Sequence, residues 1–199
     1  MEQKTVKRSM KKEFYNVEAP ITAMKISLYG GNPEEFDGKT IILDLTKSLR
    51  GRSFELRMRI KNENGKLVAV PMNLRLAGSY IRRAMHRGID YVEDSFNAEC
   101  RDAIVRIKPF LITRKNVSRA VRKALRETAN KYIISYIKIR SIKELFSDIM
   151  TNKLQKGIAS KLKKIYPLAM SEIRVFEFLK DKAETKDNKI AEETDKEAE

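Results

Sequence analysis

Ser53–Leu76 reads SFELRMRIKNENGKLVAVPMNLRL, and this stretch decides how the first half of the chain is interpreted. Every second residue from Phe54 to Ile60 is apolar, and the same alternation returns over 67–76. A period of two is typical of a strand that buries one of its faces. Asn64-Gly65, between the two runs, is a strong signal for a tight hairpin turn. The stretch therefore predicts two antiparallel strands, with Pro71 at an edge or a bulge.

Weaker alternating segments continue the pattern on both sides of this hairpin. They cover 13–19, 21–28, 40–45, 89–96 and 100–112. One short helical segment is expected at 78–87, so residues 13–112 are predicted to be mainly antiparallel β-structure. A final strand at 171–179 is expected to return and pair with this sheet.

After Thr113 the apolar residues recur every three or four positions, as in a helix with one buried face. Helices are therefore expected over 116–165, with a possible break at Gly157. The apolar stripe from Ile142 to Ile165 is predicted to pack on the sheet. Strands followed by helices indicate the α+β fold class.

The first turns of this helical region, residues 115–132, read KNVSRAVRKALRETANKY. At ~100° per residue, four cations share one arc of the helix and four less polar residues lie on the far side. The cationic arc consists of Lys115, Arg119, Arg122 and Arg126. The apolar back consists of Val117, Val121, Ala124 and Thr128. The apolar back is predicted to dock on the body, leaving the cations available to a ligand.

The charge of the chain points to a polyanionic partner. The 199 residues contain 42 Lys and Arg against 27 Asp and Glu, a net charge of +15. Residues 181–199 hold eight acids and four lysines, a charge of −4, which leaves +19 on residues 1–180. Such an excess favours a nucleic-acid partner that neutralises it. We predict a disordered basic arm at 1–12, one domain at 13–180 and a disordered acidic tail at 181–199.

Residues that could carry catalysis are scarce. His86 is the single histidine and Cys100 the single cysteine, so neither a catalytic triad nor a structural zinc site is indicated. Gly38-Lys39-Thr40 resembles the end of a phosphate-binding loop, but Pro33 stands where that motif requires its first glycine. We predict no enzyme activity, no cofactor, no metal and no small-molecule substrate.

Basic residues, by contrast, form organised clusters in which arginine dominates. Arginine suits paired phosphate oxygens and also stacks on bases. The candidate RNA-binding residues are Lys4, Lys7, Arg8, Lys11, Lys12, Lys47, Arg50, Arg52, Arg82, Arg83, Arg87, Arg114, Lys115, Arg119, Arg122 and Arg126. Candidate aromatic residues for base stacking are Phe14, Tyr15, Tyr80, Tyr91, Tyr132 and Tyr136.

Several short motifs resemble one known family. KEFYNVEAP at 12–20 is similar to the opening motif of the archaeal and eukaryotic small-subunit ribosomal protein family S3Ae, or eS1, although Phe14 stands where Trp is usual. The segments LDL at 43–45, YIRRAMHRGID at 80–90 and KKIYPLAMSEIRVFEFLK at 163–180 resemble later parts of that family, in the same order. The resemblance covers residues 12–180, and we expect an archaeal member of the family.

The resemblance implies a β-barrel-like body with packed helices. It also implies a ribosome-bound, cytoplasmic protein on the platform of the small subunit near the mRNA exit. Expected partners are small-subunit rRNA, neighbouring ribosomal proteins and mRNA near the exit, and the family offers no catalytic residues. One alternative is a free, non-ribosomal RNA-binding factor. Another is a membrane-surface or partner-helix role for residues 141–165, whose helix would be basic and amphipathic.

Overall fold

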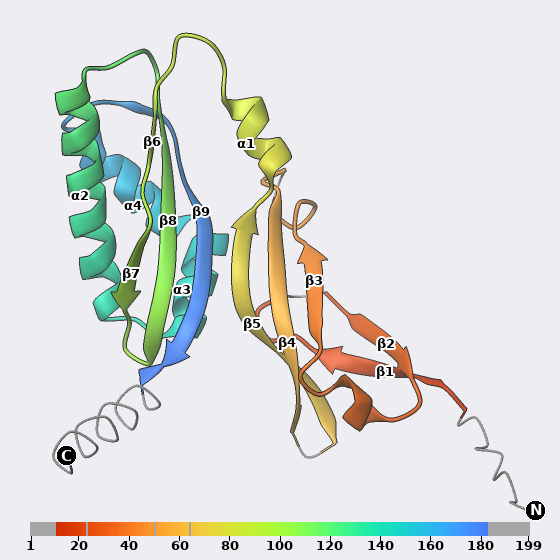
Figure 1. Ribbon diagram of the computed structural model, residues 1–199. Coiled ribbons are helices and arrows are strands. Elements are labelled where there is room, and N and C mark those ends of the chain that lie inside the picture. Colours follow the sequence, from red (N-terminus) through yellow and green to blue (C-terminus); the bar gives the residue numbers. More distant parts are fainter. Residues whose placement is uncertain (1–10, 23, 50, 64, 183–199) are drawn as a thin grey trace, which may run out of the picture. The chain divides into compact units, whose positions relative to one another are not determined.

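The structure is a computed structural model that describes residues 11–182 except 23, 50 and 64 (Figure 1). The predicted basic arm up to residue 10 and the predicted acidic tail from residue 183 lie outside the described residues. The described chain groups into two compact units. The first comprises residues up to Ile41 together with Met58–Pro71, and the second comprises Ile42–Arg57 and the residues from Met72 onward. The single domain expected for 13–180 stays a prediction.

The first unit is built from short paired strands. Strand β1 (Glu13–Glu18) pairs antiparallel with β2 (Ile26–Gly30), and the short 3-10 helix η1 (Pro33–Phe36) follows. β1 also pairs with β5 through Val17 and Leu67, and this pairing is parallel. The sheet is thus antiparallel as predicted, except at this one junction among the described strands.

Strands β4 (Phe54–Glu63) and β5 (Lys66–Leu76) confirm the hairpin expected from the sequence. The side chains of β4 alternate between buried and exposed from Phe54 to Lys61. Gly65 has a φ of +82°, the left-handed conformation that a tight turn requires and that glycine adopts without strain. Pro71 falls between the part of β5 that pairs with β1 and the part that pairs with β9 (Leu168–Asp181). Its missing N–H therefore removes no bond from the β1 ladder or from the β9 ladder.

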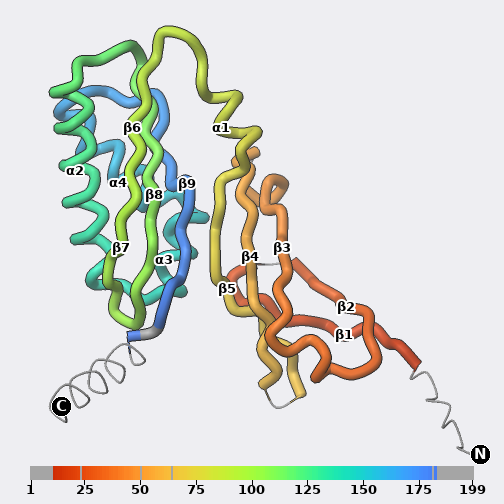
Figure 2. Tube along the Cα trace, viewed as in Figure 1, coloured from red at the N-terminus to blue at the C-terminus, as the bar shows by residue number. Residues whose placement is uncertain are grey.

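The second unit is organised around one long antiparallel pair. Strand β8 (Ala103–Thr113) runs beside β9, from Ala103 opposite Asp181 to Thr113 opposite Leu168, with three register shifts (Figure 2). The C-terminal strand therefore returns to the sheet as predicted, and it is longer than the expected 171–179. Strands β6 (Tyr91–Glu93) and β7 (Phe96–Glu99) pair with the far side of β8, and β3 (Thr40–Asp44) pairs with β4.

The strand order β2-β1-β5-β9-β8-β6 has two ends, with β3 and β7 paired off this path. In the described part of the chain these strands form an open mixed sheet. The α+β class and the mainly antiparallel sheet are confirmed, and the sheet is not closed, so the expected barrel-like body describes it only loosely. Closure needs a hydrogen-bonded partner for each terminal strand.

The predicted helical region 116–165 consists of three helices. They are α2 (Arg119–Lys138), α3 (Ile142–Met150) and α4 (Lys153–Leu162). Ser141 and Glu144 form a capping box that starts α3. Asn152, with a φ of +67°, turns the chain between α3 and α4. The expected break at Gly157 is wrong, since Gly157 lies inside α4. The separate helix α1 (Gly78–Ala84) ends three residues before the predicted limit at Arg87.

Helices α2, α3 and α4 all lie on one face of the β8–β9 pair (Figure 1). The rings of Phe146 on α3 and Phe176 on β9 meet edge to face, with centroids 4.9 Å apart, and both are fully buried. The predicted apolar stripe is confirmed from Leu145 to Leu162, because its inner members Ile149, Leu154 and Ile158 are buried. The exceptions are its two ends, Ile142 and Ile165.

Gly157 allows α4 to approach α2 closely. A Cβ atom placed on Gly157 would lie 2.2 Å from the hydroxyl oxygen of Tyr132 on α2 and 3.0 Å from the ring carbon that bears it. Real Cβ atoms do not come so close to a neighbouring side chain. The glycine is therefore explained by the space that the Tyr132 ring occupies, and not by a helix break.

Gly157→Ala tests this close approach. Alanine has the better helix propensity by about 1 kcal/mol, but overpacking costs about 1–3 kcal/mol. We expect a net loss of up to about 2 kcal/mol in the free energy of unfolding, measured by urea denaturation. In a Tyr132→Leu background the same substitution should instead stabilise by about 1 kcal/mol. Equal effects in the two backgrounds would contradict the steric explanation.

Candidate nucleic-acid interface

The start of α2 is fixed to the end of β8 by two polar residues. The Thr113 hydroxyl donates to the carbonyl oxygen of Asp90 at 2.8 Å, and the Asp90 carboxylate accepts from the backbone N–H of Val117 at 2.8 Å. The hydroxyl of Ser118 then accepts from the N–H of Val121 at 3.4 Å and caps the helix. These bonds hold the first turns of α2 beside strand β6.

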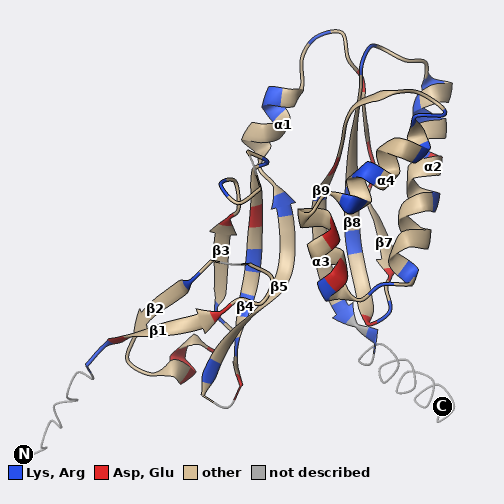
Figure 3. Ribbon diagram, turned by 180° about the vertical axis from the view of Figure 1, so that it is seen from behind, with Lys and Arg blue, Asp and Glu red and all other residues tan. Residues whose placement is uncertain are grey.

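The first two turns of α2 and strand β6 enclose a shallow hollow on the surface. It is lined by Tyr91, Val92, Arg119, Arg122, Lys123 and Arg126. We call these six residues the cationic rim. Figure 3 shows basic residues gathered at this upper end of α2. The Tyr91 ring packs on Phe110, with centroids 6.0 Å apart, and its side chain remains 49% exposed.

The acids near the cationic rim neutralise it only in part. Arg126 lies 4.0 Å from Asp94, and Asp94 also accepts a hydrogen bond of 2.6 Å from the Asn130 amide. Lys123 forms a solvent-exposed ion pair with Glu127 on its own helix at 3.9 Å. Within the described ranges, no carboxylate lies within 4.0 Å of Arg119 or Arg122. Two guanidinium groups thus remain available to phosphate oxygens, which they can bind in a paired geometry.

The sequence predicted the wrong side of α2 as the buried one. The residues buried along α2 are Leu125, Ala129, Ile133 and Ile137. The expected apolar back, Val121, Ala124 and Thr128, is only half-buried. At about 100° per residue, Arg122 and Arg126 fall in the same arc as the buried residues. The arginines therefore lie along the contact between α2 and the sheet edge, and not on the outer side of the helix.

The reason is that one face of α2 covers different parts of the protein along its length. From Leu125 onward this face covers the core, whereas the first turns lie over β6, a strand of three residues at one end of the strand order. At an exposed edge, a long cationic side chain keeps its head in water while its stem packs on the surface below. The same face can thus carry arginines at one end and core residues at the other.

The structure brings together only part of the predicted RNA-binding set. Arg119, Arg122 and Arg126 share the cationic rim, and Arg114 and Lys115 are exposed in the loop just before α2. The rim also contains Lys123, which the prediction missed although it directly follows Arg122 on the same helix. Tyr91, predicted only as one of six aromatic candidates, completes it.

The other predicted residues lie elsewhere. Lys11 and Lys12 are exposed beside β1, and Lys47 is exposed in the loop after β3. On α1, Arg82 and Arg83 are exposed, the latter 5.8 Å from the ring of Tyr80, and Arg87 is exposed beyond that helix. The remaining four, Lys4, Lys7, Arg8 and Arg50, lie outside the described residues.

Arg52 is engaged with its own protein. Its guanidinium donates to the carbonyl oxygen of Met150 at 2.7 Å and lies 4.0 Å from the carboxylate of Glu172 on β9. The amide of Gln155 donates to Glu172 at 3.3 Å and to the carbonyl oxygen of Ile149 at 3.0 Å. This cluster ties the α3–α4 junction to β9, so the side chain of Arg52 already has a structural use.

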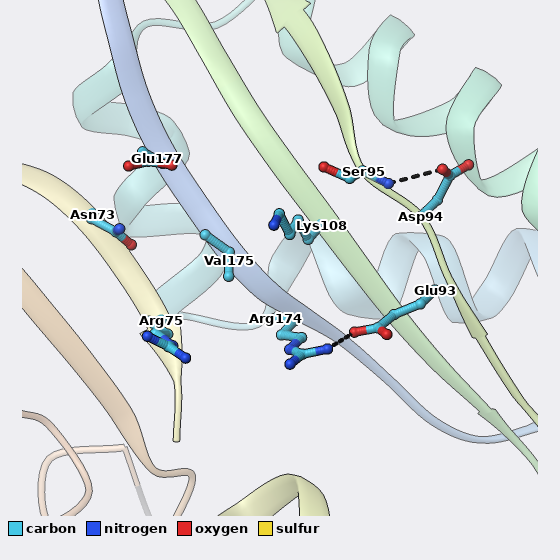
Figure 4. Close-up of a pocket in the computed structure, with 9 residues that line it drawn as sticks. All are labelled: Asn73, Arg75, Glu93, Asp94, Ser95, Lys108, Arg174, Val175 and Glu177. Atoms are coloured by element: carbon cyan, nitrogen blue, oxygen red, sulfur yellow. Dashed lines mark hydrogen bonds and ion pairs between the residues drawn. The ribbon is translucent and has the colours of Figure 1, made fainter. Parts of the chain in front are cut away.

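A second hollow lies on the face of the sheet away from the helices (Figure 4). Its cations are Arg75, Lys108 and Arg174, and its acids are Glu93, Asp94 and Glu177. Arg174 is bonded to Glu93, and Glu177 also pairs with Arg106 at 3.6 Å. Because the hollow has as many acids as cations, and each of its acids already meets an arginine, it offers a polyanion less than the cationic rim does.

Among the described residues, neither His86 nor Cys100 lies in a catalytic arrangement of side chains. His86 is exposed beyond α1, and Cys100 is fully buried, where its thiol donates to the carbonyl oxygen of Ala103. No group of three potential metal ligands occurs among the residues that were placed. Within the same ranges, no helix combines the length and apolarity needed to cross a bilayer.

Comparison with known proteins gives a consistent result. The model of the Ribosomal S3Ae family matches residues 1–182. A protein of Nanoarchaeum equitans named small ribosomal subunit protein eS1 is 24% identical over 174 residues, which cover 83% of this chain and 88% of that protein. Proteins of the same name from Methanothrix thermoacetophila and Haloarcula marismortui are each 28% identical, covering 89% and 87% of this chain and 88% and 85% of their own length.

The Arg52–Glu172 cluster generates a pH-dependent prediction. Burial raises the pKa of Glu172 above its usual 4.5, and nearby Arg52 and the Gln155 hydrogen bond only partly oppose this. The folded protein therefore holds this proton at pH values where the unfolded chain has lost it. The contribution of Glu172 to stability is greatest below pH 4.5 and falls as the pH rises through the folded pKa.

Glu172→Gln removes this titration and leaves the shape of the side chain nearly unchanged. We expect the free energy of unfolding of the variant to rise relative to that of the parent as the pH increases from about 4 to 7. Urea denaturation of both proteins across this range measures the difference, and all other titrating groups cancel. A difference that is constant with pH would contradict the buried, raised-pKa carboxyl.

Proposed function

Because the chain belongs to the Ribosomal S3Ae family, we propose that it is a structural constituent of the small ribosomal subunit that binds small-subunit rRNA on the platform near the mRNA exit. The resemblance stated from the sequence motifs is confirmed by the family match, and the relatives described above are archaeal, as expected. Membership in a ribosomal protein family also agrees with the prediction of a protein without enzyme activity.

The cationic rim is the observation that supports rRNA binding best. It places three arginines and one lysine around a single hollow, and among the described residues only two of these four have a carboxylate within ion-pair distance. Phosphate groups that enter such a site release condensed counterions, which favours binding at moderate salt. Because α2 is held rigidly on β8 and β6, these cations are presented without the entropic cost of ordering a loop.

Tyr91 adds a second chemical property to the rim. Its half-exposed ring lies within the hollow, among the cationic side chains. A base that leaves an RNA stack can pack on an aromatic ring while its phosphates pair with arginine. The rim therefore suits an RNA that has an irregular or unpaired segment beside a helix.

The proposal includes the setting of the protein. It is ribosome-bound in the cytoplasm, with neighbouring small-subunit proteins as partners and mRNA near the exit as a further one. A free, non-ribosomal RNA-binding factor remains the alternative function. The membrane-surface role considered for residues 141–165 has lost its basis, because the apolar stripe of α3 and α4 is buried inside the protein.

Triple substitution of Arg119, Arg122 and Arg126 by Ala tests the cationic rim. The logarithm of the binding constant falls with the logarithm of salt concentration by about 0.7–0.9 for each phosphate contact. We expect the triple variant to bind small-subunit rRNA more weakly and to reduce this slope by about 2 to 3. Fluorescence anisotropy over a salt series measures the effect, and circular dichroism should show an unchanged fold.

A matched control removes three positive charges elsewhere in the same unit. Lys161, Lys163 and Lys164, at the end of α4, are all exposed. Their replacement by Ala should change the salt slope much less than the rim substitution does. Equal losses from the two triple variants would mean that only overall charge matters, and the rim would no longer be the binding site.

Sedimentation separates the ribosomal proposal from its alternative. In a lysate of the source cells, the protein should travel with small subunits at low salt and leave them only as the salt concentration rises. A protein found only in the light fractions at every salt concentration would favour the free RNA-binding factor.

A further inference from the structure

The first unit exposes a pair of aromatic rings that nothing in the chain covers within the described residues. Phe14 on β1 is 74% exposed and Tyr29 on β2 is 59% exposed, the two highest values for aromatic residues in the described chain. They are register partners in the β1–β2 pair, and their ring centroids lie 5.0 Å apart with a tilt of 45°. Each ring thus already packs against one aromatic neighbour and offers its other surface to solvent.

The strand register fixes these rings on the outer face. Tyr15, the neighbour of Phe14, points inward, where its hydroxyl donates to the carbonyl oxygen of Gly31 at 3.0 Å and its ring packs on Phe36. Because neighbouring side chains on a strand point to opposite faces, this anchor turns Phe14 outward. Gly30 lets Phe36 approach, since a Cβ there would lie 2.3 Å from the Phe36 ring.

Phe14 and Tyr15 were two of the six aromatic candidates from the sequence. Phe14 lies on this outer face, whereas Tyr15 is half-buried and packs within the first unit. The second exposed ring is Tyr29, which sequence reasoning missed because it lies on the next strand and only the pairing of β1 with β2 brings it beside Phe14.

The groups around the two rings are complementary to the phosphate and base of an unpaired nucleotide. The ammonium of Lys12 lies 6.0 Å from the centroid of the Tyr29 ring, and Lys11 is exposed next to it. Two residues further along the same face, Asn16 accepts a hydrogen bond from Ser27 at 3.0 Å. The face therefore offers cations for phosphate, rings for bases and an amide for base edges, in that order along β1.

Charge decides between an RNA and a protein as the occupant. Residues 1–12, the segment that leads into β1, contain five cations and one acid in the sequence. Among the described residues of this strand pair, Glu18 is the acid on the same face as Phe14, and it lines a neighbouring hollow together with Lys25. The exposed Glu13 lies on the opposite face of β1. An excess of positive charge beside exposed rings favours a polyanion with flat apolar faces, which is the chemistry of single-stranded RNA.

We propose that Phe14 and Tyr29 form a stacking platform for unpaired RNA bases, with Lys12 placed to meet the adjoining phosphate. This site lies in the first unit and shares no residue with the cationic rim. It rests on the proposed function only in taking RNA as the polyanion. A duplex presents its bases edge-on within a continuous stack, so the platform selects single-stranded segments.

Phe14→Trp gives a direct reporter for this site, because the chain contains no tryptophan. The full-length variant is titrated with a short oligouridine, and separately with an RNA duplex of the same length. At high salt the phosphate contacts are weakened and stacking remains. Saturable quenching of the tryptophan fluorescence by the single strand but not by the duplex is the expected result. No quenching, or equal quenching by both, would overturn the platform.

Substitution of both rings tests their contribution to affinity. Phe14→Ala with Tyr29→Ala should weaken oligouridine binding by about fivefold or more for each ring, with the salt slope unchanged. Phe14→Leu with Tyr29→Leu should lose as much, because leucine keeps the apolar surface and removes the π-face. Phe14→Tyr with Tyr29→Phe keeps both rings and should bind like the parent. Ile139→Ala, at an isoleucine that is 80% exposed on the second unit, is the matched control and should have no effect.

The outcomes separate this proposal from the proposed function. If the Arg119, Arg122 and Arg126 variant lowers the salt slope while tryptophan quenching persists, both sites stand. If that variant has no effect and quenching persists, the platform stands and the rim fails. Unchanged oligouridine affinity in the Ala and Leu double variants overturns the platform. Unchanged affinity combined with loss of assembly into small subunits would assign the ring pair to a protein neighbour and would equally overturn it.

Discussion

The antiparallel pairing of β8 with β9 is the constraint on which the second unit depends. The two strands are neighbours in the sheet, and the chain between them is the three helices α2, α3 and α4. Their inward side chains, such as Ile107 and Phe176, form the apolar floor on which these helices pack. Because the strands can pair only when this long connection is folded back, sheet and helices stabilise one another. The position of α2, and with it the cationic rim, follows from this closure.

The periodicity of apolar residues predicted the helices and strands well. It failed where the structure depended on a strand or residue that is distant in the sequence. The alternation in β4 and the stripe from Leu145 to Leu162 specify buried faces directly, since each pattern has one apolar side. On α2, periodicity gave the angles of the arginines but not the side on which the sheet lies. The arrangement of the strands as an open sheet or a barrel depends likewise on which edges pair, and no local pattern encodes that.

Arg52 and Arg119 show why charge alone does not identify a binding site. Both were candidates, since each belongs to a basic cluster with few acids nearby in sequence. In the structure, Arg52 meets Glu172 and the carbonyl group of Met150, both of which are remote in the chain. Arg119 has no such carboxylate partner within the described residues. A guanidinium that already meets a carbonyl group and a carboxylate of its own protein gains little from phosphate, whereas one that ends in water can exchange its hydration for a paired contact.

The two RNA sites proposed here differ in their physical basis, and this difference has a consequence for the protein as a whole. The cationic rim acts through charge, so its contribution to RNA affinity weakens as the salt concentration rises and salt cations compete for the phosphates. The Phe14–Tyr29 platform acts through stacking, which depends little on salt but requires bases that are free of their partners. A net charge of +15 favours binding to any RNA, whatever its sequence. Selectivity for unpaired segments of a folded RNA needs contacts that charge does not dominate, and the proposed platform on the β1–β2 strand pair would provide such contacts through its two exposed rings.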